Sequence, residues 1–253
     1  MKWIRDRVLS GEWMGGTFLN LGSSVTAEIA AKAGFDWLLI DIEHGMGDRQ
    51  EVLAQLQAVE ASPAAPVVRI AWNDPVLFKR VLDLGTSGVM VPYVNSAEEA
   101  RRAAAAMRYP PEGVRGVARL NRACAFGPSF TEYFKSANSN LLTVVQIETT
   151  AAIESCPKIA AVDGVDVLFV GPLDLSVSLG VPDQFGHPAM QEALAKVAQA
   201  CRGAGKAAGI LVATEEQLAQ VKALGFTFVA LGSDGGVVVR EMRALAGTLA
   251  KHR

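Results

Sequence analysis

The sequence predicts a (β/α)8 barrel, the TIM-barrel class of α/β fold. Eight short apolar runs alternate with eight amphipathic or Ala-rich stretches along 253 residues, and this number of strand–helix units is typical of that class. The sixth run, residues 165–170, is almost entirely apolar and ends at Gly171-Pro172, as expected for a parallel strand that is buried on both faces. A doubly wound open sheet is the alternative fold, but it rarely needs eight regular repeats.

The predicted strands are residues 16–21, 37–41, 66–70, 88–94, 141–148, 165–170, 208–212 and 226–232. The predicted helices are residues 24–34, 49–61, 74–84, 96–107, 149–160, 188–203, 214–223 and 235–250. Ser96, followed by two early glutamates, is typical of a helix start. Gly34, Gly85 and Gly225 stand where a left-handed residue is expected to end a helix.

Two longer segments interrupt this alternation. Residues 108–140 are polar and rich in Arg and Gly, and residues 180–187 form a second loop after the sixth strand. Long loops in a compact domain are usually lids or interface arms. We find no linker, charge block or low-complexity tract, so residues 1–253 are predicted to form one domain.

Composition excludes several classes of partner. With 24 Lys+Arg against 26 Asp+Glu and no basic stripe, nothing favours a nucleic acid or an anionic membrane as a partner. No apolar run approaches the length of a membrane span or of a signal peptide, so we expect a soluble, cytoplasmic protein. Cys124, Cys156 and Cys201 have no metal-type or disulfide-type spacing, and we expect lone, buried thiols.

Polar residues gather at the predicted carboxyl ends of the strands, where barrels of this class carry their active sites. These residues are Asp41, Glu43, His44, Arg69, Gln146, Glu148 and Asp174. Glu148 and Asp174 follow neighbouring strands, and two close carboxylates repel each other unless a cation or a shared proton lies between them. Oxygen ligands favour Mg²⁺ or Mn²⁺; the alternative is that both acids cap helices or pair with arginines.

Arg69 lies within an apolar run, so its charge must meet an anion. That anion is either a structural carboxylate or the carboxylate or oxyanion of a substrate. His44 stands beside Asp41 and Glu43 and is a candidate general base, although a histidine in such a loop is more often structural.

Two other chemistries are disfavoured. Residues 232–236 occupy the position where many barrels bind phosphate, but Asp234 would repel that anion, and a helix start is the better interpretation. A Schiff-base aldolase needs a lysine near the strand ends. Lys206 precedes the seventh strand, and the following lysines fall in predicted helices or loops: Lys32, Lys79, Lys135, Lys158, Lys196, Lys222 and Lys251.

With these residues identified, the chain resembles the HpcH/HpaI family of metal-dependent (class II) pyruvate aldolases, relatives of the citrate-lyase β-subunit. The matching stretches are Ala33–His44, Val68-Arg69, Asp83–Gly85, Val91-Pro92, Tyr109–Gly116, Gln146–Glu148 and Gly171–Ser176. They span predicted strands two to six in the order found in the family, and together they are highly specific.

The resemblance implies reversible cleavage of 4-hydroxy-2-oxo acids to pyruvate and an aldehyde with Mg²⁺, Mn²⁺ or Co²⁺. It further implies the following roles: Glu148 and Asp174 as metal ligands, Arg69 on the pyruvate oxygens, Gln146 and the backbone at Leu173 as substrate contacts, and His44 as general base. Asp83 would raise the basicity of that histidine, provided that a turn or a neighbouring subunit brings the two together. Asp174 would then also lie in the substrate site.

The resemblance also has implications for the oligomeric state and for the choice of substrate. Members of the family form hexamers, as dimers of trimers that exchange their last helices, which would suit the apolar stripe Val238, Met242, Leu245 and Leu249. Phe18 and Asn20 stand where many members carry Trp and Gly, on the wall that faces the aldehyde. Hydroxypyruvate, with one extra hydroxyl, would need little additional space in place of pyruvate.

Two alternatives remain. A related lyase of malyl-CoA or citramalyl-CoA thioesters would share the carboxylates, but it normally needs a longer chain and a basic patch. A non-catalytic barrel that binds carboxylates would keep Arg69 but need not keep His44 with Glu148 and Asp174.

Overall fold

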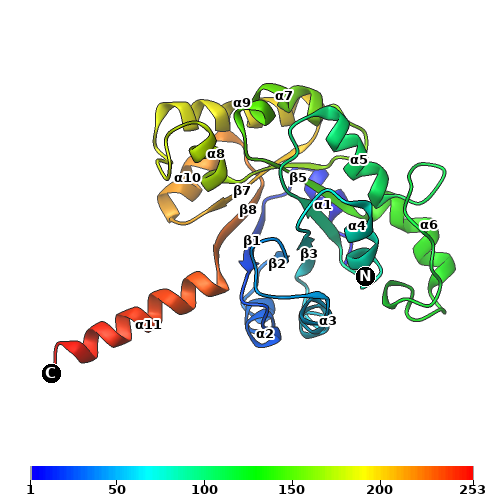
Figure 1. The fold of residues 1–253 in the computed structure, drawn as a ribbon, viewed down its shortest axis with the longest axis horizontal. Helices are drawn as coiled ribbons and strands as arrows, with labels where there is room; N and C mark the ends of the chain where they lie inside the picture. Colours follow the sequence, from blue (N-terminus) through cyan, green and yellow to red (C-terminus); the bar gives the residue numbers. More distant parts are fainter. Residues whose placement is uncertain (1, 253) are drawn as a thin grey trace.

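The structure is a computed structural model that describes residues 2–252, and its architecture is the predicted (β/α)8 barrel. Eight parallel strands pair in chain order, and β8 closes the barrel on β1 (Figure 1). The strands are β1 (Met14–Leu19), β2 (Trp37–Asp41), β3 (Ala65–Arg69), β4 (Gly88–Val91), β5 (Leu142–Ile147), β6 (Val167–Val170), β7 (Ala207–Val212) and β8 (Phe228–Ser233). The helices are α1 (Arg5–Leu9), α2 (Ser24–Lys32), α3 (Arg49–Ala58), α4 (Pro75–Leu82), α5 (Ala97–Met107), the short 3-10 helix η1 (Arg122–Cys124), α6 (Phe130–Asn140), α7 (Thr150–Ala160), α8 (Pro172–Ser178), α9 (Pro188–Ala204), α10 (Glu215–Leu224) and α11 (Asp234–Ala250).

Each of the eight predicted strands and eight predicted helices has a counterpart within a few residues of its expected bounds. The predicted caps are confirmed: Ser96 accepts a hydrogen bond from the backbone N–H of Glu99, and Gly34, Gly85 and Gly225 have φ values of 99°, 91° and 94°. The three cysteines are free and buried, as predicted.

The interior of the barrel is filled by every second side chain of the strands. Trp37, Phe169 and Phe228 occupy its centre, and the rings of Trp37 and Phe228 stack with centroids 4.0 Å apart. An aromatic pair of this kind contributes about 0.5–1.5 kcal/mol beyond the burial of its area. The interior is therefore a packed core rather than an open channel.

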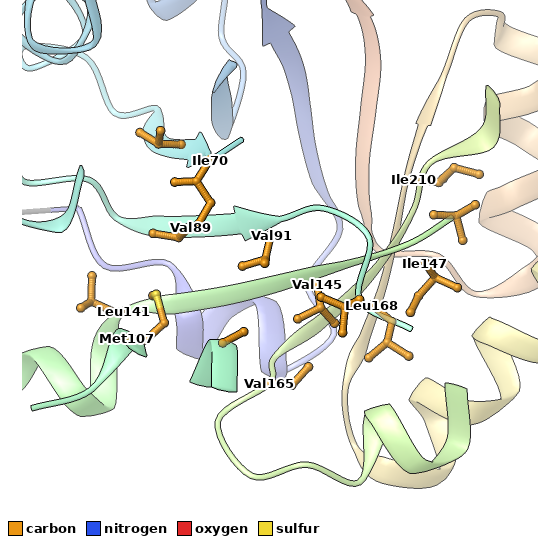
Figure 2. Packing of buried hydrophobic residues seen from close by; sticks show 14 of the residues in the cluster. Ile70, Val89, Val91, Met107, Leu141, Val145, Ile147, Val165, Leu168 and Ile210 are labelled. Atoms are coloured by element: carbon orange, nitrogen blue, oxygen red, sulfur yellow. The ribbon is translucent and has the colours of Figure 1, made fainter. Parts of the chain in front are cut away.

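A second apolar layer lies between the outer face of the strands and the helices. Figure 2 shows part of it, with Val145 and Ile147 from β5 and Leu168 from β6 among its labelled residues. Because these strands are covered on both faces, they read as continuous apolar runs, which is the pattern that predicted them.

Helix α1, which was not predicted, closes the amino-terminal end of the barrel. Ile4 and Val8 pack against the interior cluster. Arg5 Nε donates to Asp166 Oδ1 at 3.0 Å, just before β6. The opposite, carboxyl end is thus the mouth through which a substrate can enter.

The prediction of one long loop at residues 108–140 is wrong in its second half, because α6 lies there with Tyr133 and Ala137 buried. The first half contacts the ends of α3 and α4: Arg122 Nη1 donates to the carbonyl of Leu84, and Nη2 donates to Glu60, both at 2.8 Å. These helices run back from the mouth, so their ends lie at the amino-terminal end of the barrel. The segment is therefore no lid over its own mouth, and a role as an interface arm stays a prediction.

Helix α11 projects away from the barrel and carries the carboxyl end of the chain (Figure 1). The predicted stripe is exposed along it, with Met242 and Leu245 each 63% and Leu249 69% accessible. None of the helices within residues 2–252 is both long and apolar enough to cross a lipid bilayer.

Candidate active site

Strand geometry brings the predicted polar residues to the mouth. Leu39 and Val67 point into the barrel, so the two-residue period of a strand places Asp41 and Arg69 on the same inward face at the carboxyl ends of β2 and β3. The two residues are also direct neighbours in the register of these strands. Gln146 ends the inward face of β5 in the same way.

Arg69 is held by carboxylates of its own chain. Its Nε and Nη2 donate to the two carboxylate oxygens of Asp41 at 2.9 and 2.7 Å, and its Nη1 lies 2.9 Å from Glu43 Oε2. Of the two predicted anions, the structural carboxylate is therefore present. Arginine has five N–H donors, and the bidentate pair with Asp41 uses two of them, so the oriented guanidinium keeps donors for a further anion.

Glu148 is buried, with 2% of its surface accessible, and each of its oxygens accepts one hydrogen bond. Gln146 Nε2 donates to Oε1 at 2.8 Å, and the backbone N–H of Tyr93 donates to Oε2 at 2.9 Å. Burial raises the pKa of Glu148 to about 7, and the neighbouring charges of Glu43 and Asp174 act in the same direction. The fold thus holds a carboxylate whose charge the protein alone does not fully compensate.

Tyr93, which sequence reasoning missed, connects the two predicted metal ligands. Its backbone bonds Glu148, and its hydroxyl donates to Asp174 Oδ1 at 2.8 Å. This hydrogen bond raises the pKa of Tyr93 to about 12, so the hydroxyl stays a donor at neutral pH. The only sequence signal was its place directly after Val91-Pro92 at the end of the fourth strand.

The Gly171-Pro172 turn brings Asp174 to the mouth. A Cβ atom at residue 171 would lie 2.7 Å from Glu148 Cγ, so only glycine permits this close approach of the two strand ends. Asp174 lies in the first turn of α8, a helix that was not predicted. The N–H of Leu173, at the second position of this helix, has no acceptor within the helix and is open to an external one.

His44 and Glu43 form the outer part of the site. The His44 side chain is 67% exposed, and its Nε2 lies 3.8 Å from Glu43 Oε1. Asp41 Oδ1 accepts the backbone N–H of Glu43 at 3.0 Å, which fixes this turn beside Arg69. Burial raises the pKa of Glu43, and its Oε2 has no correctly aligned hydrogen bond among the described residues.

Asp83 does not join this group within one chain. It ends α4 and therefore lies at the amino-terminal end of the barrel, whereas His44 lies at the mouth. Its carboxylate accepts from Arg115 Nη2 at 3.0 Å, and Arg115 Nη1 donates in turn to the hydroxyl of Tyr133. Any contact between Asp83 and a His44 has to come from another subunit.

Phe18 and Asn20 differ in their surroundings. Phe18 is buried in the mouth, with the guanidinium of Arg69 centred 5.4 Å from its ring centroid. Asn20 accepts from the backbone N–H of Gly235 at 3.2 Å, and its own N–H donates to Asp234 at 2.8 Å, so it ties β1 to the start of α11. Of the two, only Phe18 faces the carboxylate site.

The residues fit a divalent cation held by few protein ligands. Within residues 2–252, no group of three or more His, Cys, Asp or Glu side chains is arranged as a complete metal site. Glu148 and Asp174 supply two carboxylates, which suits an ion that keeps waters or substrate oxygens as its other ligands. The raised pKa of buried Glu148, to which the charges of Glu43 and Asp174 contribute, also fits a site where a cation would offset negative charge.

The two disfavoured chemistries have no support in the structure. Ser233 caps α11 by accepting the N–H of Gly236, so residues 232–236 are the predicted helix start. No lysine lies in a strand among the described residues; Lys206 stands just before β7, at its amino end.

A (β/α)8 barrel that gathers carboxylates, an arginine and an amide at the carboxyl ends of its strands has the architecture of an enzyme active site. The model of the family HpcH/HpaI aldolase/citrate lyase matches residues 15–240. The chain therefore belongs to this family, and it is an enzyme of the carbon–carbon lyase class.

Individual relatives agree with this assignment. The chain is 46% identical over 231 residues to a 4-hydroxy-2-oxo-heptane-1,7-dioate aldolase of Shigella sonnei, covering 91% of this chain and 88% of the relative. It is 45% identical over 243 residues to the enzyme of the same name from Klebsiella pneumoniae, covering 96% and 92%. A crystal structure of an HpcH/HpaI aldolase/citrate lyase family protein from Burkholderia cenocepacia superposes with a TM-score of 0.92 at 36% identity and covers 98% of both chains.

Proposed function

We propose that this protein catalyses the reversible aldol cleavage of 4-hydroxy-2-oxo acids to pyruvate, or hydroxypyruvate, and an aldehyde. The observation that carries the proposal is the cluster at the mouth, in which Arg69, Gln146 and Glu148 are linked by hydrogen bonds and Asp174 is linked to them through Tyr93. The names of the relatives point to the same class of substrate.

Glu148 and Asp174 would hold the divalent ion, for which we propose Mg²⁺, Mn²⁺ or Co²⁺. When bound, the ion would supply positive charge for the oxygens of the 2-oxo acid. The amide of Gln146 donates a hydrogen bond to Glu148 and would hold it in position, and the open N–H of Leu173 would bind a substrate oxygen.

Arg69 would stabilise the negative charge that develops when the C3–C4 bond breaks and an enolate forms. Its guanidinium is already oriented by Asp41, so little reorganisation is needed as that charge appears. The fixed orientation also explains why a flexible lysine would be a poor replacement.

His44 would accept the proton of the C4 hydroxyl during cleavage. Histidine is the side chain whose ordinary pKa lies nearest to neutral pH, which suits a general base, and the exposure of His44 at the mouth leaves it free to reach a substrate. Glu43 is its acidic neighbour within the chain, and Asp83 of another subunit would be a second one in an assembly.

For the assembly we propose a homohexamer, a dimer of trimers in which α11 is exchanged between subunits. The support for this proposal is the row of exposed apolar side chains on α11, among them Met242, Leu245 and Leu249. A surface of this kind normally packs against another chain.

The test is an aldol assay of the full-length protein with pyruvate and with hydroxypyruvate over a panel of aldehydes. Exhaustive chelation should abolish turnover, and Mg²⁺, Mn²⁺ or Co²⁺ should restore it. Glu148→Gln and Asp174→Asn should lose the restored activity, whereas Glu132→Gln, on the surface of α6, should retain it.

Three other outcomes would contradict the proposal. Full activity after chelation would exclude the metal. Turnover of acyl-CoA thioesters in place of free oxo acids would indicate a malyl-CoA or citramalyl-CoA type of lyase. Tight binding of oxo acids without any turnover would indicate a carboxylate-binding barrel.

A further inference from the structure

Tyr93 occupies an unusual position between the two carboxylates at the mouth. It follows β4 and contacts residues that follow the next two strands, β5 and β6: its N–H donates to Glu148 Oε2 at 2.9 Å, and its hydroxyl donates to Asp174 Oδ1 at 2.8 Å. One residue thus provides a hydrogen bond to each side chain of the pair, one from its backbone and one from its ring.

The backbone conformation of Tyr93 explains how both bonds are possible. Its φ is 51°, in the left-handed region that residues other than glycine, asparagine and aspartate rarely adopt. A bulky residue persists in this region only where its surroundings hold it there, and such residues gather at functional sites.

The surroundings of Tyr93 do hold it. The carbonyl of Tyr93 accepts from Asn95 Nδ2 at 3.0 Å, and the N–H of Val94 donates to the carbonyl of Gln146 at 3.2 Å. The ring of Trp72 lies beside the ring of Tyr93, with the two centroids 6.3 Å apart. Both the backbone and the ring of Tyr93 therefore have holding contacts within the chain.

The bonds from Tyr93 leave part of each carboxylate free. Glu148 accepts one hydrogen bond on each oxygen, and each carboxylate oxygen has a second lone pair. The hydroxyl of Tyr93 bonds Oδ1 of Asp174, which leaves Oδ2 available. This is the arrangement by which neighbouring donors orient the ligands of a metal ion.

We propose that Tyr93 is a positioning residue that orients the carboxylates of Glu148 and Asp174 toward a shared divalent cation. The inference rests on the proposed metal site. It assigns Tyr93 no contact with the substrate and no transfer of a proton. Its effect is on the affinity for the ion, which can be measured without turnover.

The experiment is Mn²⁺ binding to metal-free, full-length protein, followed by calorimetry. Tyr93→Phe deletes the hydroxyl and keeps the ring and the backbone donor, and it should raise the Kd for Mn²⁺ by about tenfold to a hundredfold, the usual effect of losing a group that orients a ligand. The melting temperature of the metal-free protein should change little. Tyr109→Phe is the matched control, because the hydroxyl of Tyr109 is buried without a hydrogen-bond partner among the described residues and its loss should leave the Kd unchanged.

A second variant covers the case in which the Phe variant does not fold. Tyr93→Gly adopts a left-handed backbone without strain and also lacks the hydroxyl, so it should show at least the same loss of Mn²⁺ affinity. If the wild-type protein binds Mn²⁺ and these variants bind it equally well, the inference is wrong while the proposed metal site stands. If the wild-type protein itself does not bind Mn²⁺, the proposed function fails first.

Discussion

Replacement of Glu148 by Gln should remove a specific part of the pH dependence of folding. Burial, with Glu43 and Asp174 nearby, raises the pKa of Glu148 to about 7 from an ordinary value of 4.5. A group whose pKa is higher in the folded state stabilises the fold fully below its unfolded pKa and loses that contribution as pH rises through the folded pKa. The metal-free protein should therefore become less stable between about pH 4.5 and pH 7.

The magnitude follows from the difference in pKa. About 2.5 pKa units at 1.36 kcal/mol each give roughly 3.4 kcal/mol, of which about 2.5 kcal/mol fall between pH 5 and pH 8. With 2% of the residue accessible, little of this is screened by solvent. For a chain of this size, 1 kcal/mol corresponds to a melting-temperature shift of about 2–4 °C, so Glu148 should account for about 5–10 °C.

The assay is thermal unfolding of chelator-treated protein at pH 5 and pH 8. For each protein, the melting temperature at pH 8 is subtracted from that at pH 5, and this difference is compared between wild type and Glu148→Gln. The hydrogen bonds that Gln makes or loses shift the melting temperature equally at both pH values, so they cancel in the comparison. Glu98→Gln, on an exposed glutamate of α5, should retain the wild-type difference. Equal pH dependence in wild type and Glu148→Gln would refute the assignment of a raised pKa to this carboxylate.

Three further predictions concern the chemistry and the assembly. Arg69→Lys should lower kcat/KM by roughly tenfold to a thousandfold, because lysine cannot hold two oxygens in the geometry of the guanidinium; an unchanged value in steady-state assays would make Arg69 purely structural. His44→Ala should lower kcat by roughly a hundredfold to ten-thousandfold with little change in Mn²⁺ affinity, the range for a general base, and loss of Mn²⁺ binding with intact chemistry at saturation would make it a binding residue. Leu245→Glu on α11 should reduce the size of the assembly in analytical ultracentrifugation without unfolding the barrel, because this side chain is exposed on a helix that projects from it; an unchanged assembly would exclude this face from the interface.

The barrel and most of its mouth could be predicted from sequence because strand geometry is regular. Once the apolar runs were assigned to parallel strands, the residues at their carboxyl ends had to meet at one rim, and Asp41, Arg69, Gln146 and Glu148 do meet there. The period of two then determined which of these side chains face inward. Neither step required knowledge of a distant contact.

Tyr93 could not be found in this way, because its role depends on a backbone conformation rather than on residue type. A tyrosine after a strand is usually an ordinary apolar or surface residue, and nothing in the sequence predicts a φ of 51°. Tyr93 is held by hydrogen bonds with Glu148 and Asn95, and its neighbour Val94 by one with Gln146. Glu148 and Gln146 lie more than 50 positions away in the chain.

Asp83 shows the complementary limit of reasoning from one chain. The resemblance pairs it with His44 through either a turn of the same chain or a neighbouring subunit. A helix that follows a strand returns to the amino-terminal end of the barrel, and Asp83 lies there at the end of α4, which excludes the turn. Its carboxylate is held at this end by Arg115, a fully buried side chain that packs over the ring of Tyr109 with its guanidinium 4.4 Å from the ring centroid. A side chain fixed so firmly at one end of the barrel cannot swing to the mouth. If Asp83 acts on a histidine base, the catalytic pair has to be completed between two subunits, so that loss of assembly would lower kcat while leaving each barrel folded.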